Sequence, residues 1–190
     1  MRKTKRKILG YRRKREGKTN YRRRLKILSS GSLRIVVRKS LKNMMCQLIE
    51  YNLDGDKVIL SSSSKELEKK YGWNFSKRNI PAAYLTGLLL GVKAKKKGVK
   101  NAILDIGLNK SVKGCKIYAV LKGVLDAGLE VPHSKESLPD DKALKGEKIV
   151  NYFNLPKKND TVFFNYKKDK KVADLPKVVE ETKKKIIEGK

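Results

Sequence analysis

Three short segments between residues 33 and 62 are rich in apolar residues, and the first of them is β-branched and partly alternates apolar with polar residues, a pattern typical of strands. They cover residues 33–40, 44–51 and 58–62. A short turn at Lys42-Asn43 separates the first two segments, and an Asp-Gly pair within residues 52–56 indicates a hairpin before the third. The pattern therefore predicts three consecutive antiparallel strands, a meander.

The first of these strands is predicted to have two unlike faces. Alternation along a strand places Leu33, Ile35 and Val37 together on one side. The opposite side receives a mixed set of residues: Arg34, Val36, Arg38 and Ser40. We expect the apolar face to lie against a core and the other to form a basic platform.

Helical patterns follow the meander. Pro81 suits a first helical turn, and residues 82–93 are mostly strong helix formers. Residues 101–108 predict a short, buried fourth strand. Apolar residues then recur at the spacing of one helix face between residues 115 and 128. The predicted fold class is α/β, a mixed sheet with a β-β-β-α-β-α core.

The composition becomes more polar after residue 131, so residues 132–147 are predicted to form a loop. A short helix is expected over residues 148–154, and residues 161–166 form a strand or an anchoring apolar segment. Residues 175–187 predict a terminal helix with a thin apolar stripe. This region is too polar to build a core of its own.

The longest uncharged apolar run, residues 80–92, has 13 residues. A membrane-spanning helix needs about 20, so we expect no membrane association. Cys46 and Cys115 lie far apart within apolar stretches, which predicts buried, reduced thiols and a cytosolic compartment.

Charge changes this picture most at the N-terminus. The 190-residue chain has a net charge of +29, and its first 26 residues hold fourteen Lys or Arg against one acid, Glu16. Tyr11 and Tyr21 stand between the basic clusters. Such a concentration of like charge favours a polyanionic partner, and Arg with Tyr suits RNA, where phosphate contacts combine with stacking on bases.

Two simpler explanations of this basic segment remain beside RNA binding. A transit peptide would also be rich in Arg and poor in acids, but this segment lacks an enrichment in Ser and a clear apolar face. A solvated tail is the other alternative. The breaker residues 29–32 end the segment. We therefore expect an extended basic arm over residues 1–32, an α/β core over 33–131 and a C-terminal extension of loops and helices over 132–190.

Enzymatic motifs are weak in this chain. Gly17-Lys18-Thr19 resembles the end of a phosphate-binding loop, but Arg12 stands where that motif needs glycine. A metal-dependent nuclease would need converging carboxylates, and the acids at hand are the scattered Glu50, Asp105 and Asp126. We expect no catalytic residues, no cofactor, no metal site and no small-molecule substrate.

Several segments together resemble a known family. They are REGKTNY at residues 15–21, LRIVVRKS at 33–40, QLI at 47–49, residues 79–86 and 102–108, and AGLEVPHS at 127–134. This set is similar to the archaeal and eukaryotic 5S-rRNA-binding proteins of the large ribosomal subunit, numbered eighteen in archaea and five in eukaryotes. The resemblance runs over nearly the whole chain and is looser after about residue 150, where the length matches the archaeal form.

The resemblance implies an α/β core whose basic arm and one sheet face hold 5S rRNA in the central protuberance. By position, the arm would contact RNA through Lys14, Arg15, Lys18, Tyr21, Arg22, Arg23 and Arg24. The first strand and its turn would add Arg34, Arg38, Lys39, Ser40 and Lys42. His133 lies in a segment that resembles a family loop near RNA.

The implied partners are 5S rRNA, 23S rRNA and neighbouring ribosomal proteins, and the implied location is the large ribosomal subunit in the cytoplasm. The C-terminal extension would pack on both the core and RNA. A general basic RNA chaperone is the alternative, and it differs in binding unrelated RNAs equally well.

Overall fold

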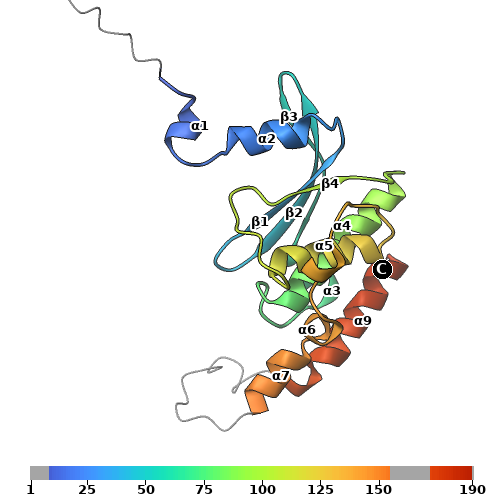
Figure 1. Cartoon of the computed structure of the whole chain (residues 1–190). Coiled ribbons are helices and arrows are strands. Elements are labelled where there is room, and N and C mark those ends of the chain that lie inside the picture. The colour runs from blue at the N-terminus through green and yellow to red at the C-terminus, as the bar shows by residue number, and fades with distance from the viewer. Residues whose placement is uncertain (1–8, 155–171, 190) are drawn as a thin grey trace, which may run out of the picture.

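A four-stranded mixed sheet organises the computed structural model, which describes residues 9–154 and 172–189 (Figure 1). The strands are β1 (Arg34–Lys39), β2 (Met44–Asn52), β3 (Gly55–Ser63) and β4 (Ile103–Asp105), in the spatial order β3-β2-β1-β4. β1, β2 and β3 pair antiparallel, and β4 runs parallel to β1. The predicted meander and the α/β fold class are confirmed.

The fourth strand is shorter than predicted. Only Ile103–Asp105 pair with β1, whereas residues 101–108 were expected to be extended. Asn101 instead forms an isolated bridge with Glu130, and the Asp105 side chain accepts a hydrogen bond from the Gly107 amide at 2.9 Å. That short-range bond turns the chain away from the sheet.

Helices α4 (Ile80–Lys96) and α5 (Lys116–Asp126) cover one face of the sheet, as the apolar pattern predicted (Figure 1). Ile35 and Val37 of β1 lie in the core that these helices share with the sheet. Asn79 caps α4 by accepting a hydrogen bond from the Ala82 amide at 2.8 Å, and Pro81 occupies the first turn. α4 is buried on nearly all sides, which makes it the central helix of the core.

The two helices cross closely at Gly87 and Gly123. A Cβ atom on Gly87 would overlap the carbonyl oxygen of Val120 and lie 2.8 Å from its carbonyl carbon. A Cβ atom on Gly123 would likewise overlap the Tyr84 carbonyl oxygen. These glycines therefore permit a contact between backbones that no larger residue permits.

We expect Gly87→Ala to lower the free energy of unfolding by about 1–3 kcal/mol, the usual cost of overpacking. The better helix propensity of Ala offsets at most about 1 kcal/mol of that cost. Thermal unfolding measures the change, with Gly10→Ala as the control because a Cβ atom there meets only ordinary contacts. Equal midpoints for the two variants would contradict the close crossing.

One helix of the core was not predicted. α3 (Ser64–Tyr71) follows β3 directly, so the core order is β-β-β-α-α-β-α. Ser63 caps it by accepting a hydrogen bond from the Lys65 amide, and Gly72 ends it in the left-handed conformation. Within α3 only Ser64 and Leu67 are buried. So little apolar surface gives no helical stripe to detect in the sequence.

The C-terminal region adds short helices and one long one: η1 (Lys135–Ser137), α6 (Asp141–Lys145), α7 (Glu147–Asn154), η2 (Val172–Asp174) and α9 (Leu175–Glu188). The helices expected near 148–154 and 175–187 are confirmed, whereas the loop expected over 132–147 contains η1 and α6. The segment 161–166 lies outside the described residues. α9 joins the core cluster through Leu175, Val179 and Ile186, beside α4.

The basic arm is also partly helical, which its sequence did not predict. It contains α1 (Arg12–Arg15) and α2 (Tyr21–Leu28). Asn20 caps α2 by accepting a hydrogen bond from the Arg23 amide at 3.1 Å. α2 lies over the sheet on the side away from α4 and α5 (Figure 1).

The two cysteines differ in burial. Cys46 is completely buried, and burial raises the pKa of its thiol. Cys115 precedes α5 and is half-buried, so the prediction of a buried thiol is confirmed only for Cys46. Both thiols are free.

Candidate nucleic-acid interface

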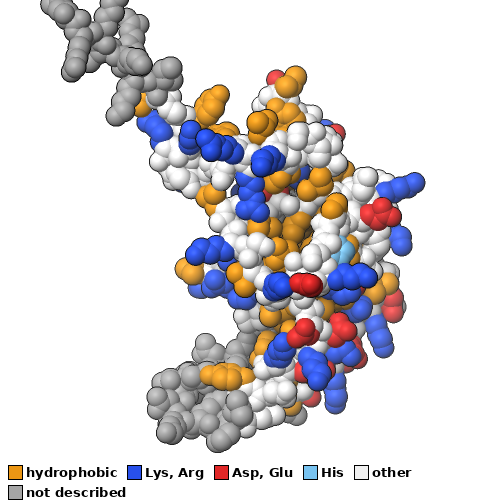
Figure 2. Space-filling model, in the orientation of Figure 1, with side chains coloured by type: hydrophobic (Ala, Val, Ile, Leu, Met, Phe, Trp, Pro, Cys, Tyr) orange, Lys and Arg blue, Asp and Glu red, His pale blue; other side chains and the backbone are white. Residues whose placement is uncertain are grey.

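A groove of about 340 Å³ runs between the arm and the face of the sheet that α4 and α5 leave open. Seven Arg or Lys side chains and two Asp side chains line it: Arg13, Lys18, Arg23, Arg24, Arg34, Arg38 and Lys39, with Asp56 and Asp105. Figure 2 shows basic side chains gathered over α1 and α2, whereas the acidic ones in this view lie mostly over α6 and α9. The charged side chains that line the groove beside the arm are therefore mainly basic.

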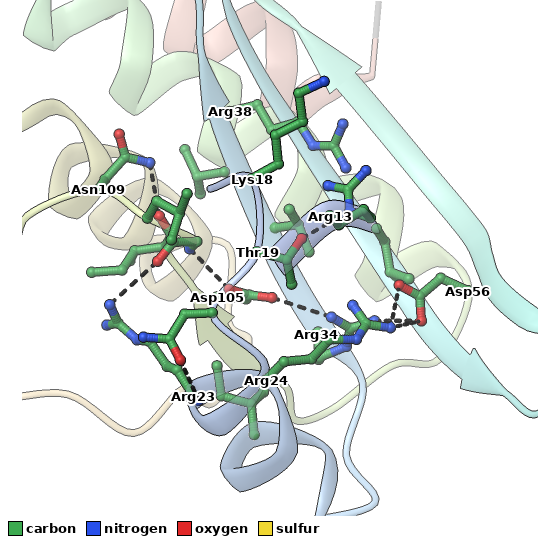
Figure 3. A pocket seen from close by; sticks show the side chains of 18 of the residues that line it. Arg13, Lys18, Thr19, Arg23, Arg24, Arg34, Arg38, Asp56, Asp105 and Asn109 are labelled. Carbon is green, nitrogen blue, oxygen red and sulfur yellow. Dashed lines mark hydrogen bonds and ion pairs between the residues drawn. The ribbon is translucent and has the colours of Figure 1, made fainter. Parts of the chain in front are cut away.

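Arg34 lies at the centre of the groove floor, and its side chain is only 2% exposed. One terminal nitrogen, Nη2, lies 2.7 Å from Oδ1 of Asp56, and the other, Nη1, donates to Oδ2 of Asp105 at 3.1 Å (Figure 3). Asp56 belongs to β3 and Asp105 to β4, the two edge strands. One guanidinium therefore ties both edges of the sheet across its open face.

The same carboxylate holds the arm. Arg24 of α2 donates from Nη2 to both oxygens of Asp56, at 2.8 and 2.9 Å. Arg23 adds a hydrogen bond to the carbonyl oxygen of Gly107 at 3.3 Å. Because Asp56 binds Arg24 and Arg34 together, the position of the arm depends on the ion pairs of the sheet.

The ion pairs shift the titration of Asp56. Burial alone raises the pKa of this carboxyl, but the hydrogen bonds and charges of Arg34 and Arg24 outweigh burial and leave the pKa below its ordinary value. A lowered pKa in the folded state contributes stability above the ordinary aspartate pKa. That contribution is lost as the pH falls through the lowered pKa.

Among the remaining cations of the groove, Lys18 pairs with Glu16 at 2.8 Å, whereas Arg38 and Lys39 keep their charges available. Both groove carboxylates are occupied by Arg34 and Arg24. Within residues 9–154 and 172–189, no carboxylate lies within ion-pair distance of Arg38 or Lys39, and both side chains are exposed. Their uncompensated charges at the end of β1 suit a phosphate backbone.

The sequence-predicted residues fall into two groups. Six of them line the groove together: Lys18, Arg23, Arg24, Arg34, Arg38 and Lys39. The others lie elsewhere: Lys14, Arg15, Tyr21, Arg22, Ser40, Lys42 and His133. Arm and first strand therefore converge as predicted, and His133 does not join them.

The predicted RNA contact through Arg34 requires a correction. The alternation of β1 places it on the open face with Arg38, as predicted, but α2 and the two aspartates bury it. A side chain that is 2% exposed and paired twice offers no free surface to a ligand. Its role in this geometry is to position the arm and the edge strands.

Three predicted residues have roles within the protein. Tyr21 packs on Tyr11 with ring centroids 5.1 Å apart, and Tyr11 remains the more exposed ring. The Ser40 hydroxyl donates to the Asn43 carbonyl and accepts from the Asn43 amide, which closes the β1–β2 turn. His133 is exposed, with Nδ1 2.7 Å from the Val131 carbonyl oxygen.

The groove residues that were not predicted from the sequence include Arg13, Asn20, Asp56 and Asn109. Arg13 stood within the basic arm, but it was not distinguished from its neighbours. Asn20 carried a detectable signal, since Asn before a run of helix formers is a typical N-cap. Asp56 and Asn109 reach the groove only through tertiary structure, and no local pattern marks them.

The candidate nuclease acids do not converge. Asp105 is paired with Arg34, whereas Asp126 accepts a hydrogen bond from the Tyr84 hydroxyl at 2.8 Å and pairs with Lys122. Glu50 is exposed on β2. Among the described residues, no three His, Cys, Asp or Glu side chains lie together as a metal site requires. The two-metal nuclease hypothesis finds no support in this arrangement.

Comparison with known proteins decides the family. A family model described as "Ribosomal large subunit proteins 60S L5, and 50S L18" matches residues 5–101 and 92–134. The chain belongs to this family. It is also 48% identical over 182 residues to the large ribosomal subunit protein uL18 of Methanococcus maripaludis (strain S2), covering 93% of this chain and 94% of that relative. The resemblance found in the arm and in β1 is confirmed.

Membership makes this chain a protein of the large ribosomal subunit, and a ribosomal protein works in the cytoplasm as predicted. None of the helices in the described part of the chain combines the length and the apolar character needed to cross a membrane. The basic groove therefore belongs to a ribosomal protein, a class for which RNA binding is expected.

Proposed function

We propose that this ribosomal protein binds 5S rRNA in the groove between its arm and its sheet, and helps to attach it to 23S rRNA in the central protuberance. The supporting observation is the pairing of both groove carboxylates with Arg34 and Arg24, which leaves Arg38 and Lys39 exposed and without an ion pair to any described residue. A groove with this charge favours a polyanion that follows its length.

The three parts of the chain have separate tasks in this proposal. In it, residues 1–32 are the RNA-binding arm, residues 33–131 are the core that holds the groove floor, and residues 132–190 are an extension packed on the core and on RNA outside the groove. Lys14, Arg15 and Arg22 are exposed on the arm and would contact phosphates outside the groove. The exposed Tyr11 ring would stack on a base.

The role is structural and not enzymatic, as the ribosomal family favours. Cations neutralise phosphates and release counterions, so affinity should depend steeply on salt. If about 6–10 phosphates are contacted, affinity falls by roughly 10³–10⁵ between 50 and 200 mM salt on the duplex DNA scale.

Arg38→Gln and Lys39→Gln together should weaken 5S rRNA binding by about 25- to 60-fold at 0.1 M salt. Each phosphate contact adds about 0.7–0.9 to the slope of log affinity against log salt, so the loss of two contacts removes that many decades of affinity twice between 1 M and 0.1 M salt. A gel-shift titration measures this. Both side chains are exposed at the end of β1, so the fold should be unaffected. Lys177→Gln, an exposed charge on α9, is the control and should bind like wild type. Equal affinity for the double variant and the control would overturn the proposed groove.

Competition with unrelated RNA distinguishes the chaperone alternative. A specific 5S rRNA protein should release little labelled 5S rRNA to an excess of tRNA. A general chaperone should exchange the two RNAs freely. Equal competition by tRNA and unlabelled 5S rRNA would favour the chaperone.

A further inference from the structure

Three cations from separate parts of the chain come together near the end of β1. Lys39 is the last residue of β1, Arg78 precedes α4, and Lys116 is the first residue of α5. Lys42, Arg78 and Lys116 line a depression of about 830 Å³ beside the β1–β2 turn. This depression is separate from the arm groove, which Lys39 lines.

Arg78 is fixed in place. Its Nη1 donates a hydrogen bond to the Leu41 carbonyl oxygen at 3.2 Å, which joins the segment before α4 to the β1–β2 turn. Its Nε is buried and, among the described residues, has no hydrogen-bond partner. A buried donor without a partner is costly, so this guanidinium is satisfied only in part by the protein itself.

The cluster carries positive charge that the described protein does not balance. Over the ranges 9–154 and 172–189, no carboxylate lies within ion-pair distance of Lys39, Arg78 or Lys116. Glu68 is the one acid lining the depression, and Lys77 donates to its carboxylate at 2.7 Å. Lys116 also stands at the positive end of the α5 dipole, where a cation is disfavoured.

The pKa of Lys116 reflects this unfavourable position. Burial lowers its pKa, and the charges of Arg78 and Lys39 lower it further. The free protein therefore holds a cation in a place that disfavours it. A bound anion would offset the mutual repulsion of these cations and would suit the N-terminus of α5.

The cluster continues the basic surface of the groove. Lys39 lines the groove, and its charge contributes to the lowered pKa of Lys116, so Lys39 lies between the groove and the depression. Figure 2 shows basic side chains on the projecting β1–β2 turn, below those of the arm. An RNA backbone that left the groove at Lys39 would meet Arg78 and Lys116 next.

We propose that Lys39, Arg78 and Lys116 form a second phosphate site, occupied by the backbone of the same RNA that lies in the arm groove. This inference rests on the proposed function and extends it around the end of β1. The contact is electrostatic and independent of base sequence.

Lys116→Gln tests this site. We expect 5S rRNA affinity to fall about 5- to 10-fold at 0.1 M salt, with the salt slope reduced by about one unit. The thermal midpoint of the free protein should stay equal or rise, because the substitution removes a disfavoured charge. Lys116→Arg keeps the charge and should bind like wild type, as should Lys177→Gln.

The outcomes separate this inference from the proposed function. Wild-type affinity and slope for Lys116→Gln, with weakened binding by Arg38→Gln, would overturn the second site and leave the groove intact. Binding by Lys116→Arg that is as weak as binding by Lys116→Gln would overturn the second site in the same way. Wild-type affinity for Arg38→Gln and Lys39→Gln together would overturn the groove, and the second site with it.

Discussion

Arg34→Leu should lower the free energy of unfolding by about 3 kcal/mol and loosen α2 from the sheet. Removing one partner of a buried ion pair costs about 3–5 kcal/mol, because the other charge is left without compensation. The lower end applies here, since Asp56 is 27% exposed and water screens part of its charge. Urea unfolding measures the stability, and hydrogen exchange of the α2 amides measures the docking of the arm.

Arg22→Leu is the matched control, because Arg22 is exposed on α2 outside the groove lining. It should change stability by less than about 0.5 kcal/mol. Adding Asp105→Asn to Arg34→Leu removes the carboxylate that has lost its ion-pair partner and should recover part of the loss, whereas Asp56 still pairs with Arg24. If Arg34→Leu and Arg22→Leu were equally stable, Arg34 would not tie the sheet edges to the arm.

Removal of residues 1–19 should weaken 5S rRNA binding by about 100- to 30,000-fold at 0.1 M salt. This range assumes that the segment contacts about 3–5 phosphates and that each contact contributes about 0.7–0.9 decades of affinity at 0.1 M salt. The segment holds ten Lys or Arg and one Glu. A filter-binding titration at several salt concentrations measures both the affinity and the slope.

The position of the cut matters for interpreting this truncation. Ending it at residue 19 keeps the Asn20 cap, the Arg24–Asp56 ion pair and Ile27, which lines the groove beside Val36. The sheet face therefore stays covered, and thermal unfolding should change little. Wild-type affinity for a folded truncation would show that the arm before α2 does not hold RNA.

Sequence patterns predicted the elements whose burial is regular. α5 has a full apolar stripe, and the meander has a partly alternating first strand and clear turn residues between its strands, so both were recognised. α3 was missed because Leu67 is nearly its whole buried face, and α2 because its like charges indicated an extended arm. Local periodicity reports how much surface an element buries, and these two helices bury little.

The sequence predicted which basic residues of the strand share a face, but not which other residues cover them or pair with them. Alternation placed Arg34 and Arg38 on the same face, and that placement holds for both. Whether an arginine on that face is exposed depends on what covers it, and here α2, Asp56 and Asp105 arrive from distant parts of the chain. Arg78 and Lys116 were not noticed for the same reason, since only the tertiary fold brings them near Lys39.

Covalent labelling of lysines in the free protein and in its 5S rRNA complex tests the central claim most directly, with mass spectrometry as the readout. The proposed groove predicts strong protection of Lys18 and Lys39, which line it, and unchanged labelling of Lys177 on α9. Equal labelling of Lys18 and Lys39 in both states, with protection of Lys177, would place the RNA elsewhere and contradict the proposed groove.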